Sequence, residues 1–325
     1  MTGVVIGLSA VVMAVRDGEA VALTVRPKDS RTHSLSTLAG LPFGPFDPDG
    51  HRTFELALRA FVTEQTRFEL GYVEQLYTFG DKGRDAPRAE VGAGAQRVIS
   101  VGYLALTPQA VEALGPETVW TPMRLLFPWE DWRRGRPAVI DSAIAAPLLK
   151  WAVTEDRRER ARRLFALDGA PWNEERVLER YELLYEAGLA PEAARDRERA
   201  RGGPGAEPEA FSAQLGDPML SDHRRILATG LGRLRGKLKY RPVIFELMPA
   251  EFTLSQLQHT VEAVAGVALH KQNFRRGLER ADLVEGLGRV HAETGGRPAE
   301  LFRFRREQTR SGPAPGLALP LLRDG

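Results

Sequence analysis

The sequence predicts an α+β protein with more than one domain. Strand-like runs dominate the first hundred residues, a charged helical stretch covers Trp129 to Ala194, and a second mixture of helices and strands follows residue 220. Residues 195–218 are poor in apolar residues and rich in Pro and Gly, so we predict that they form a linker. With 325 residues, the chain is long enough to build two hydrophobic cores.

The residue counts exclude several kinds of site. The chain has no Cys, which excludes disulfides, thiolate nucleophiles and Cys-ligated zinc and is consistent with a reducing cytosol. Its 6 His are scattered without a helical ligand spacing, so we expect no metal site. No run of about 18 apolar residues is present and the apolar N-terminus lacks a basic leader, so we predict a cytoplasmic protein without a membrane segment.

The N-terminal part should open with a β-hairpin. Val4 to Val15 and Ala20 to Arg26 are rich in β-forming residues, and Asp17-Gly18 between them favours the positive φ angles of a tight turn. The three Pro residues between Leu41 and Gly50 interrupt backbone pairing, so this segment should be irregular.

A helix and two further strands should complete the N-terminal part. Thr53 is a plausible N-cap, and the apolar stripe that follows it ends near Thr66. Strand-like runs follow at Tyr72–Phe79 and Val98–Leu106. In the middle segment, a further helix should place one apolar stripe on its buried side, formed by Val177, Tyr181 and Leu184.

The C-terminal elements predict a winged helix-turn-helix domain. A basic amphipathic helix (His223 to Lys239) and a short strand (Pro242 to Met248) come first. They are followed by a helix capped by Thr253 (Leu254 to Val264), a turn at Gly266, a second helix (His270 to Arg280) and strand-like runs up to Phe304. The order helix, helix, β-hairpin is that of a winged helix. We therefore predict domains at residues 1–150 and 220–325, with a helical segment and linker at 151–219.

The net charge of the chain is the sum of two opposite parts. The whole chain carries 45 Lys and Arg against 43 Asp and Glu, a net charge of +2. Residues 221–325 have 18 basic against 11 acidic residues, a net of +7, which leaves 27 against 32, a net of −5, for residues 1–220. The basic C-terminal part therefore favours an anionic partner.

Residues 59–66 resemble the helix of the Nudix box in the spacing of some key residues, but they lack most of its metal-binding carboxylates. Arg59, Phe61 and Glu64 match the box, whereas its other carboxylate positions hold Ala60 and Thr63. Glu55 lies roughly 180° around the helix from Glu64 and cannot complete a metal site with it. One carboxylate holds hard cations poorly, so we predict no catalytic residue and no metal ligand. Alternatively, Arg59 and Glu64 form a salt-bridged helix that only supports the preceding loop.

A nucleotide pocket can survive without the hydrolytic carboxylates. In such a sandwich it is built from the sheet face and the loop before the helix, where Arg side chains suit phosphates and aromatic rings suit adenine. The predicted ligand-binding residues are Arg26, Phe46, Arg59, Glu64, Tyr77, Phe79, Arg84, Arg97 and Tyr103.

The second helix of the C-terminal domain has the composition of a recognition helix. Its Gln and Asn can pair with adenine, its Arg and Lys can reach guanine or phosphates, and Phe274 and Leu278 should form its buried stripe. An Arg at the wing tip suits the minor groove. The predicted DNA-binding residues are Thr253, Ser255, Gln256, Lys271, Gln272, Asn273, Arg275, Arg276, Arg280 and Arg297. The alternative is that the Arg residues of this helix form a solvated face.

A degenerate Nudix frame followed by a winged helix resembles the Nudix-related transcriptional regulators of NAD metabolism. The runs Gly71 to Asp81, Asn273 to Arg276 and Gly296 to Ala299 carry the resemblance. The long middle helical segment is more similar to the NadQ-type branch, which represses genes of de novo NAD synthesis, than to the NrtR-type branch. The resemblance implies a Nudix-like α/β/α sandwich with a mixed sheet, followed by a helical segment and a winged helix.

The same resemblance implies partners and a function. It implies a repressor, not an enzyme, that binds a palindromic operator in double-stranded DNA as a homodimer. It needs no cofactor and responds to an adenine nucleotide such as ADP-ribose, NAD or ATP. The alternative is a Nudix pyrophosphatase that acts on ADP-ribose or related nucleoside diphosphates through Glu64 and a second acid. The tail at Leu317 to Leu322 is either a dimer contact or a frayed end.

Overall fold

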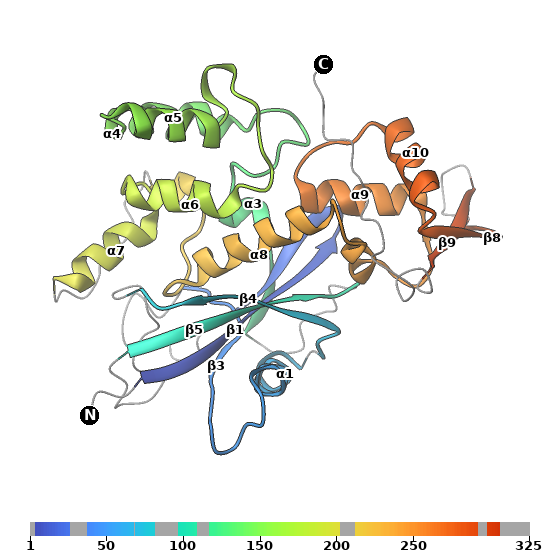
Figure 1. The fold of residues 1–325 in the computed structure, drawn as a ribbon, viewed down its shortest axis with the longest axis horizontal. Helices are drawn as coiled ribbons and strands as arrows, with labels where there is room; N and C mark the ends of the chain where they lie inside the picture. Colours follow the sequence, from blue (N-terminus) through green and yellow to red (C-terminus); the bar gives the residue numbers. More distant parts are fainter. Residues whose placement is uncertain are drawn as a thin grey trace.

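The structure is a computed structural model that describes residues 4–26, 38–67, 69–81, 97–108, 117–201, 212–291 and 298–305. Figure 1 shows a twisted sheet with α1 (Phe54–Thr66) below it and α8 (His223–Lys237) above it. Further helices stack above α8, and a small domain of helices and strands lies at the right-hand end of the molecule. None of the described helices has both the length and the apolar character that a membrane crossing requires.

The sheet is mixed and has β1 at its centre. Its strands run in the order β4-β5-β1-β2-β6, and β3 pairs with the first half of β1. The β1–β5 pair is parallel and the other pairs are antiparallel. The strands are β1 (Val4–Arg16), β2 (Glu19–Val25), β3 (Phe43–Pro45), β4 (Tyr72–Phe79), β5 (Arg97–Leu106) and β6 (Thr118–Pro122).

Most of the predicted N-terminal elements are confirmed. Asp17 (φ 51°) and Gly18 (φ 74°) form the turn of the β1–β2 hairpin, because both central residues of such a turn need positive φ. Thr53 caps α1 by accepting a hydrogen bond from the Leu56 backbone N–H. One prediction was too strict: the Pro-rich segment contains β3, a three-residue strand. Among the described strands β3 pairs only with β1, so Pro45, which lacks a backbone N–H, is tolerated in it.

The two faces of the sheet bury different cores. Leu8, Ala10 and Val12 of β1 point toward α1, whereas Val11 and Met13 point toward α8 and the helices above it. This alternation follows from the two-residue period of a strand. Because both faces are covered, β1 is apolar over almost its whole length, as the sequence shows.

The middle segment is helical, as predicted. Its elements are α3 (Met123–Leu126), the π-helical turn η2 (Ile140–Ile144), α4 (Ala145–Trp151), α5 (Glu155–Leu164), the 3₁₀ turn η3 (Leu167–Gly169), α6 (Val177–Glu186) and α7 (Pro191–Ala200). The predicted stripe of Val177, Tyr181 and Leu184 is fully buried. Figure 1 shows α5 and α6 stacked over α8.

Part of the predicted linker is wrong. Residues 195–200 belong to α7, and Arg195 and Asp196 are buried against each other. The Arg195 guanidinium also donates to the carbonyls of Met219 (2.7 Å) and Ser221 (2.8 Å), so it holds both ends of the segment together. The low apolar content of this segment predicted that it would be exposed to solvent. Arg195 and Asp196 are buried instead, because each neutralises the charge of the other. Residues 202–211 lie outside the described residues, and η4 (Ser212–Leu215) follows them.

α8 packs on the sheet although it lies within the range predicted for the DNA-binding domain. Gly230 of α8 sits directly on Val11, since a Cβ at this position would lie 2.8 Å from the Val11 side chain. α8 also contacts β4, β5 and α6. We propose that the boundary between the two domains falls after α8 rather than at residue 220.

The C-terminal elements have the predicted order. α9 (Leu254–Ala265) and α10 (Lys271–Ala281) precede the antiparallel pair β8 (Val284–His291) and β9 (Ala299–Phe304), and the short β7 (Phe252–Thr253) pairs with β9. Gly266 ends α9 with φ 70°. The strand predicted at Pro242 to Met248 is wrong, because Val243–Leu247 form the 3₁₀ helix η5 and bury Ile244 and Phe245 in the core. Its short, mostly apolar run fits either structure.

Candidate nucleic-acid interface and effector site

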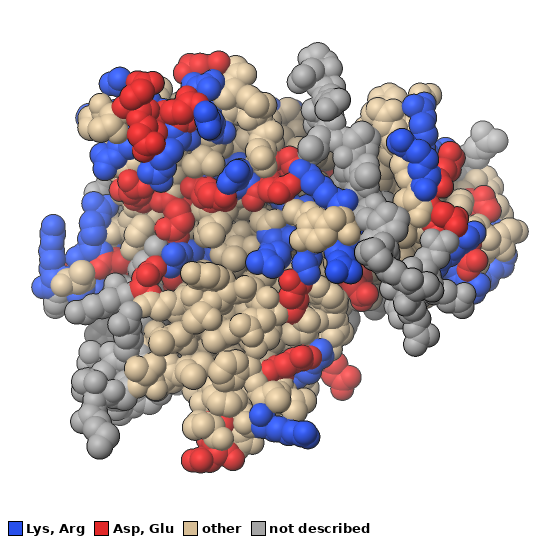
Figure 2. Space-filling model, viewed as in Figure 1, with Lys and Arg blue, Asp and Glu red and all other residues tan. Residues whose placement is uncertain are grey.

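α10 presents a cationic and amide-rich face to the solvent. Phe274 and Leu278 are buried as predicted, while Lys271, Gln272, Asn273, Arg275, Arg276 and Arg280 are exposed. No described carboxylate forms an ion pair with any of these four cationic side chains; Arg280 donates to the backbone carbonyl of Arg276. Figure 2 shows Lys and Arg side chains along the outer side of α10 at the upper right. Their charge is therefore available to a ligand.

A groove runs beside this face. It is lined by the start of α9, by Lys271 and Arg275 of α10, and by residues 298–300 and Phe302 of β9. Two of the predicted DNA-binding side chains serve the fold here. The Thr253 hydroxyl accepts from the Gln256 N–H (3.2 Å), and the Gln256 side chain accepts from the Thr253 N–H (2.7 Å), which forms a capping box. Ser255 is exposed in the groove. Arg297 lies outside the described residues.

The prediction that the net positive charge of the C-terminal part marks a DNA-binding domain needs correction. Residues 244–304 hold seven Lys and Arg against eight Asp and Glu, a net charge of −1. The positive excess of the C-terminal part therefore lies mainly in α8 and its flanks, not in the winged-helix elements. What favours DNA on α10 is that its four cationic side chains are exposed and form no ion pair with a described carboxylate.

The cations of α8 and the nearby Lys239 are neutralised within the protein. Arg224 pairs with Glu192 (3.3 Å), Arg225 with Glu182 (2.7 Å), Arg233 with Glu74 (3.5 Å), Arg235 with Glu130, Lys237 with Glu74, and Lys239 with Glu174 (3.0 Å). All these carboxylates belong to residues 1–220. The opposite charges of the two parts of the chain therefore hold α8 on the rest of the structure.

On the opposite face of the sheet, Arg59 of α1 is already engaged. It pairs with Glu55 (2.9 Å), and its guanidinium donates to the backbone carbonyls of Leu70 and Gly71 (3.0 Å to Gly71). Arg59 thus fastens the start of β4 to α1. This agrees with the alternative that Arg59 has a structural role in a salt-bridged helix, although its partner is Glu55 and not Glu64. Glu64 is exposed. Within the described ranges, no group of three or more His, Asp or Glu side chains is placed to hold a metal ion.

Tyr103 and Phe46 lie on the same side of the sheet as α1. The Tyr103 side chain is buried and its hydroxyl is 3.3 Å from the Gln75 side-chain oxygen. Burial and the nearby Glu55 carboxylate raise the pKa of Tyr103. Phe46 packs edge-on against Phe54 with 4.6 Å between ring centroids. These contacts give the face under α1 an aromatic, weakly polar character.

The other predicted ligand residues do not join them. A register shift in β4 between Gln75 and Thr78 separates Tyr77, which is 63% exposed, from Phe79, which is buried on the α8 side. The Arg225 guanidinium lies over the Phe79 ring at 5.5 Å. Arg26 is exposed at the end of β2. Arg84 and the Arg97 side chain lie outside the described residues, so the set of ligand-binding residues stays a prediction.

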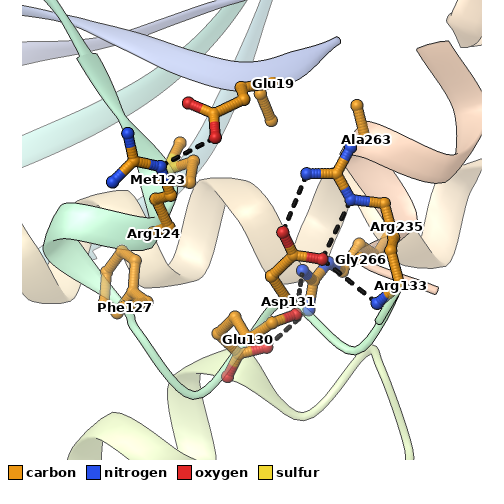
Figure 3. Close-up of a pocket in the computed structure, with 11 residues that line it drawn as sticks. Glu19, Met123, Arg124, Phe127, Glu130, Asp131, Arg133, Arg235, Ala263 and Gly266 are labelled. Carbon is orange, nitrogen blue, oxygen red and sulfur yellow. Dashed lines mark hydrogen bonds and ion pairs between the residues drawn. The ribbon is translucent and has the colours of Figure 1, made fainter. Parts of the chain in front are cut away.

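Sequence reasoning missed a buried charge cluster in which Glu130 meets Arg180 of α6 and Arg235 of α8, beside the C-terminal end of α9. The Glu130 carboxylate accepts from Arg180 (2.6 and 2.8 Å) and from Arg235, and all three side chains are buried. Burial alone would raise the pKa of Glu130, but the charges of Arg180 and Arg235 outweigh it and lower the pKa. In Figure 3, Glu130 and Arg235 lie with the Asp131–Arg133 pair on one side of a small pocket, opposite the Glu19–Arg124 pair.

His223 at the start of α8 forms a second buried polar contact. Its Nδ1 accepts a hydrogen bond from the Leu41 N–H (3.0 Å), which fastens the Pro-rich segment to α8, and its Nε2 has no partner among the described residues. Burial, and then the charge of Arg195, lowers the pKa of His223 to about 4. The imidazole is therefore neutral in the folded protein at neutral pH.

This lowered pKa predicts that acid destabilises the protein. A His with a depressed pKa takes up its proton more readily when unfolded, so its stabilising contribution is complete above pH 6.5 and declines toward pH 4. The expected loss at pH 5 is about 2 kcal/mol. Urea unfolding at pH 7 and pH 5 measures it, with His223→Gln as the non-titrating control. An equal loss in both proteins would show that other groups cause the acid sensitivity.

The C-terminal elements match a known domain family. Residues 244–304 match the family model of the NrtR DNA-binding winged helix domain. These residues form an NrtR-type winged helix. The match begins after α8, in agreement with the packing of α8 on the sheet. The predicted resemblance to Nudix-related regulators is thereby confirmed, while the assignment to the NadQ-type branch stays a prediction.

One curated relative and two solved structures extend the comparison. The ADPR responsive transcriptional repressor NtrR of Acinetobacter baylyi is 37% identical over 83 residues, 26% of this chain and 33% of that protein. The match thus spans about a third of the relative's length. NrtR of Shewanella oneidensis, solved in complex with a 27mer DNA, superposes with a TM-score of 0.54 at 20% identity over 94% of this chain and 95% of that chain.

A MutT/nudix family protein from Enterococcus faecalis has a TM-score of 0.51 at 14% identity over 94% of this chain and 88% of that chain. At these identities the two structures establish the fold alone. The predicted fold class is confirmed, with a Nudix-like sandwich joined to the NrtR-type winged helix.

Proposed function

We propose that the protein is a transcriptional repressor whose affinity for operator DNA is set by an adenine nucleotide. The observation that carries the proposal is the exposed face of α10, where Lys271, Arg275 and Arg276 have no described counter-charge within an NrtR-type winged helix. The relative from Acinetobacter is named as ADPR responsive, which supports ADP-ribose as the first effector to test. From the family resemblance we propose genes of NAD biosynthesis as its targets.

The chemistry of α10 suits a double-stranded operator. Gln272 and Asn273 carry side-chain amides that can pair with both polar atoms of an adenine edge, and Arg275 and Arg276 can reach guanine edges or phosphates. Two copies of the winged helix related by a twofold axis would contact two half-sites, so a homodimer on a palindromic operator follows from this proposal.

The effector acts through its differential affinity for two arrangements of the protein. A nucleotide that binds the sandwich more tightly in one arrangement of the winged helices shifts the population toward it, and operator affinity changes by the same coupling free energy. A typical coupling of about 1–3 kcal/mol corresponds to a change of about 5- to 150-fold in operator affinity. The sign of the change is left to experiment.

Selection of duplexes from genomic fragments, followed by titration of ADP-ribose, NAD and ATP, tests the proposal. We expect recovered duplexes to share a palindrome, and one nucleotide to change their affinity by at least fivefold while the others have little effect. Failure to enrich any duplex over bulk DNA in low salt would exclude the proposed function.

A pyrophosphatase is the second candidate, because the sandwich is Nudix-like and Glu64 is exposed on α1. We expect no release of AMP from ADP-ribose in the presence of Mg²⁺, since a single carboxylate of the Nudix frame remains. The assay is chromatography of the nucleotides after long incubation, with Glu64→Gln as the control. Turnover that disappears in Glu64→Gln would favour the enzyme over a purely regulatory protein.

Glu300 should weaken binding to non-operator DNA. It lines the groove beside Lys271 and Arg275, and its carboxylate lies over Gly286, where a Cβ would collide with it. Because non-specific binding depends on phosphates, a carboxylate in this groove opposes it. We expect Glu300→Gln to raise affinity for random duplex about three- to fivefold, as an exposed charge contact contributes up to about 1 kcal/mol.

The measurement is a salt titration with random and selected duplexes. Glu155→Gln is the matched control, since it removes the same charge from an exposed position of α5 that does not line the groove. Equal behaviour of the two variants would remove Glu300 from the interface.

A further inference from the structure

The C-terminal end of α9 is held by residues outside the winged helix. The Arg235 side chain of α8 donates through Nε to the Val264 carbonyl (2.9 Å), and the Trp132 backbone N–H donates to the Gly266 carbonyl (2.7 Å). A cation at the last carbonyls of a helix is favourable, because these groups lack partners within the helix and carry its negative dipole end. We call Glu130, Trp132, Arg235, Val264 and Gly266 the α9 seat.

The α9 seat is tightly packed. A Cβ at Gly266 would lie 2.6 Å from Arg235 Nη2 and closer still to the Glu130 carbonyl oxygen. Arg235 cannot withdraw easily, because it is buried and also donates to the Glu130 carboxylate and to the Glu174 carbonyl (2.9 Å). Moving α9 on this seat would therefore require breaking charge-assisted hydrogen bonds in a buried site.

The seat is also connected to the sheet. Arg133 pairs with Asp131 (2.8 Å) and donates to the Gly18 carbonyl in the turn of the β1–β2 hairpin. α9 packs against β1 and β2 as well. The face under α1 lies along the same strand, since Ala10 in the middle of β1 pairs with Tyr103 of β5. One continuous strand pair thus joins the predicted effector face to the seat.

The opposite end of α9 reaches the DNA-binding face. α9 has 12 residues and is about 18 Å long, and its first residues line the groove together with Lys271 and Arg275. A tilt of about 5° at the seat would move the groove end by about 1.5 Å, which is enough to misplace hydrogen bonds to bases.

We propose that the α9 seat positions the winged helix on the sheet and transmits the state of the effector site to α10. This proposal rests on the proposed function and adds the residues through which it is regulated. A seat that only stabilised the fold would change the unfolding temperature when altered, but it would leave the nucleotide-dependent change in operator affinity intact. That change is therefore the decisive readout.

Gly266→Ala tests the seat, and Gly169→Ala is its matched control. Both glycines have positive φ (70° and 76°), but a Cβ at Gly169 meets nothing within 4 Å, so the control has the same backbone strain without the collision. Operator affinity of the full-length variants is measured with and without saturating ADP-ribose. We expect the fold-change caused by ADP-ribose to drop to twofold or less in Gly266→Ala and to stay at the wild-type value in Gly169→Ala.

Arg133→Ala keeps the proposal testable if Gly266→Ala does not fold. Arg133 is partly exposed and links the seat to the Gly18 turn, so its loss should reduce the ADP-ribose effect at least threefold while the protein stays folded. A folded Arg133→Ala with the full wild-type effect would overturn the proposal, as would a folded Gly266→Ala with that effect. If the wild-type protein binds no DNA, or ignores all three nucleotides, the proposed function fails instead.

Discussion

Replacing Glu130 with alanine is expected to destabilise the folded protein by about 3–5 kcal/mol. The substitution leaves two arginines, Arg180 and Arg235, buried without their shared carboxylate. Each guanidinium keeps hydrogen bonds to backbone carbonyls, but these do not neutralise its charge. The carboxylate no longer offsets the free energy needed to remove the two guanidinium groups from water, so the folded state bears this whole desolvation cost. Denaturant unfolding of the variant, followed by circular dichroism, measures the loss.

Glu159→Ala is the matched control for this experiment. Glu159 also holds two arginines, Arg162 and Arg163, but it lies on the surface of α5, where water solvates all three side chains. We expect no measurable change in stability, because exposed ion pairs contribute little. If the two variants lost similar stability, the contrast between buried and exposed pairs would not hold in this protein.

Local patterns predicted most secondary structure because each depended on few residues. The β1–β2 turn needed only Asp17 and Gly18 at positive φ, and α9 needed only its capping residue Thr253 and an apolar stripe. The winged helix could be recognised for the same reason, since its order of elements is encoded over a short stretch. Among the misassigned segments, η5 is a short, mostly apolar run whose periodicity does not distinguish strand from helix.

Long-range charge pairing could not be predicted from composition. From the residue count alone, the positive excess of the C-terminal part favoured DNA as its partner. In the structure, the side chains of Arg224, Arg235 and Lys237 instead bind carboxylates that lie more than 30 residues away in the sequence. In the sequence, the same residues make His223 to Lys239 read as a basic amphipathic helix. Only the packing of α8 on the sheet shows that Arg224, Arg235 and Lys237 point inward.

The predicted effector residues were divided by a local irregularity. Strict alternation along β4 puts Tyr77 and Phe79 on one face, but the register shift after Gln75 leaves Leu76 and Phe79 on the α8 side and Tyr77 in solvent. A β-bulge adds one residue to a strand and reverses the side-chain pattern beyond it. No feature of the sequence in this strand marks that position.

The double variant Arg275→Ala/Arg276→Ala is expected to weaken operator binding by about 30-fold or more. Both side chains are exposed on α10, and each specific contact of an arginine with a base or phosphate contributes about 1–3 kcal/mol. The helix should keep its place, because its packing depends on Phe274 and Leu278 and neither substituted side chain is buried. Mobility shifts with the selected duplex give the loss, and the salt dependence of binding should become shallower.

The double variant Arg162→Ala/Arg163→Ala separates a local effect from a general one. It removes two arginine charges from solvent-accessible positions on α5, where both arginines already pair with Glu159. If net charge governed DNA binding, both double variants would lose similar affinity. If the unpaired face of α10 is the interface, the α5 variant binds the operator within about twofold of wild type and only the α10 variant fails. Equal losses would refute the assignment of DNA binding to Arg275 and Arg276.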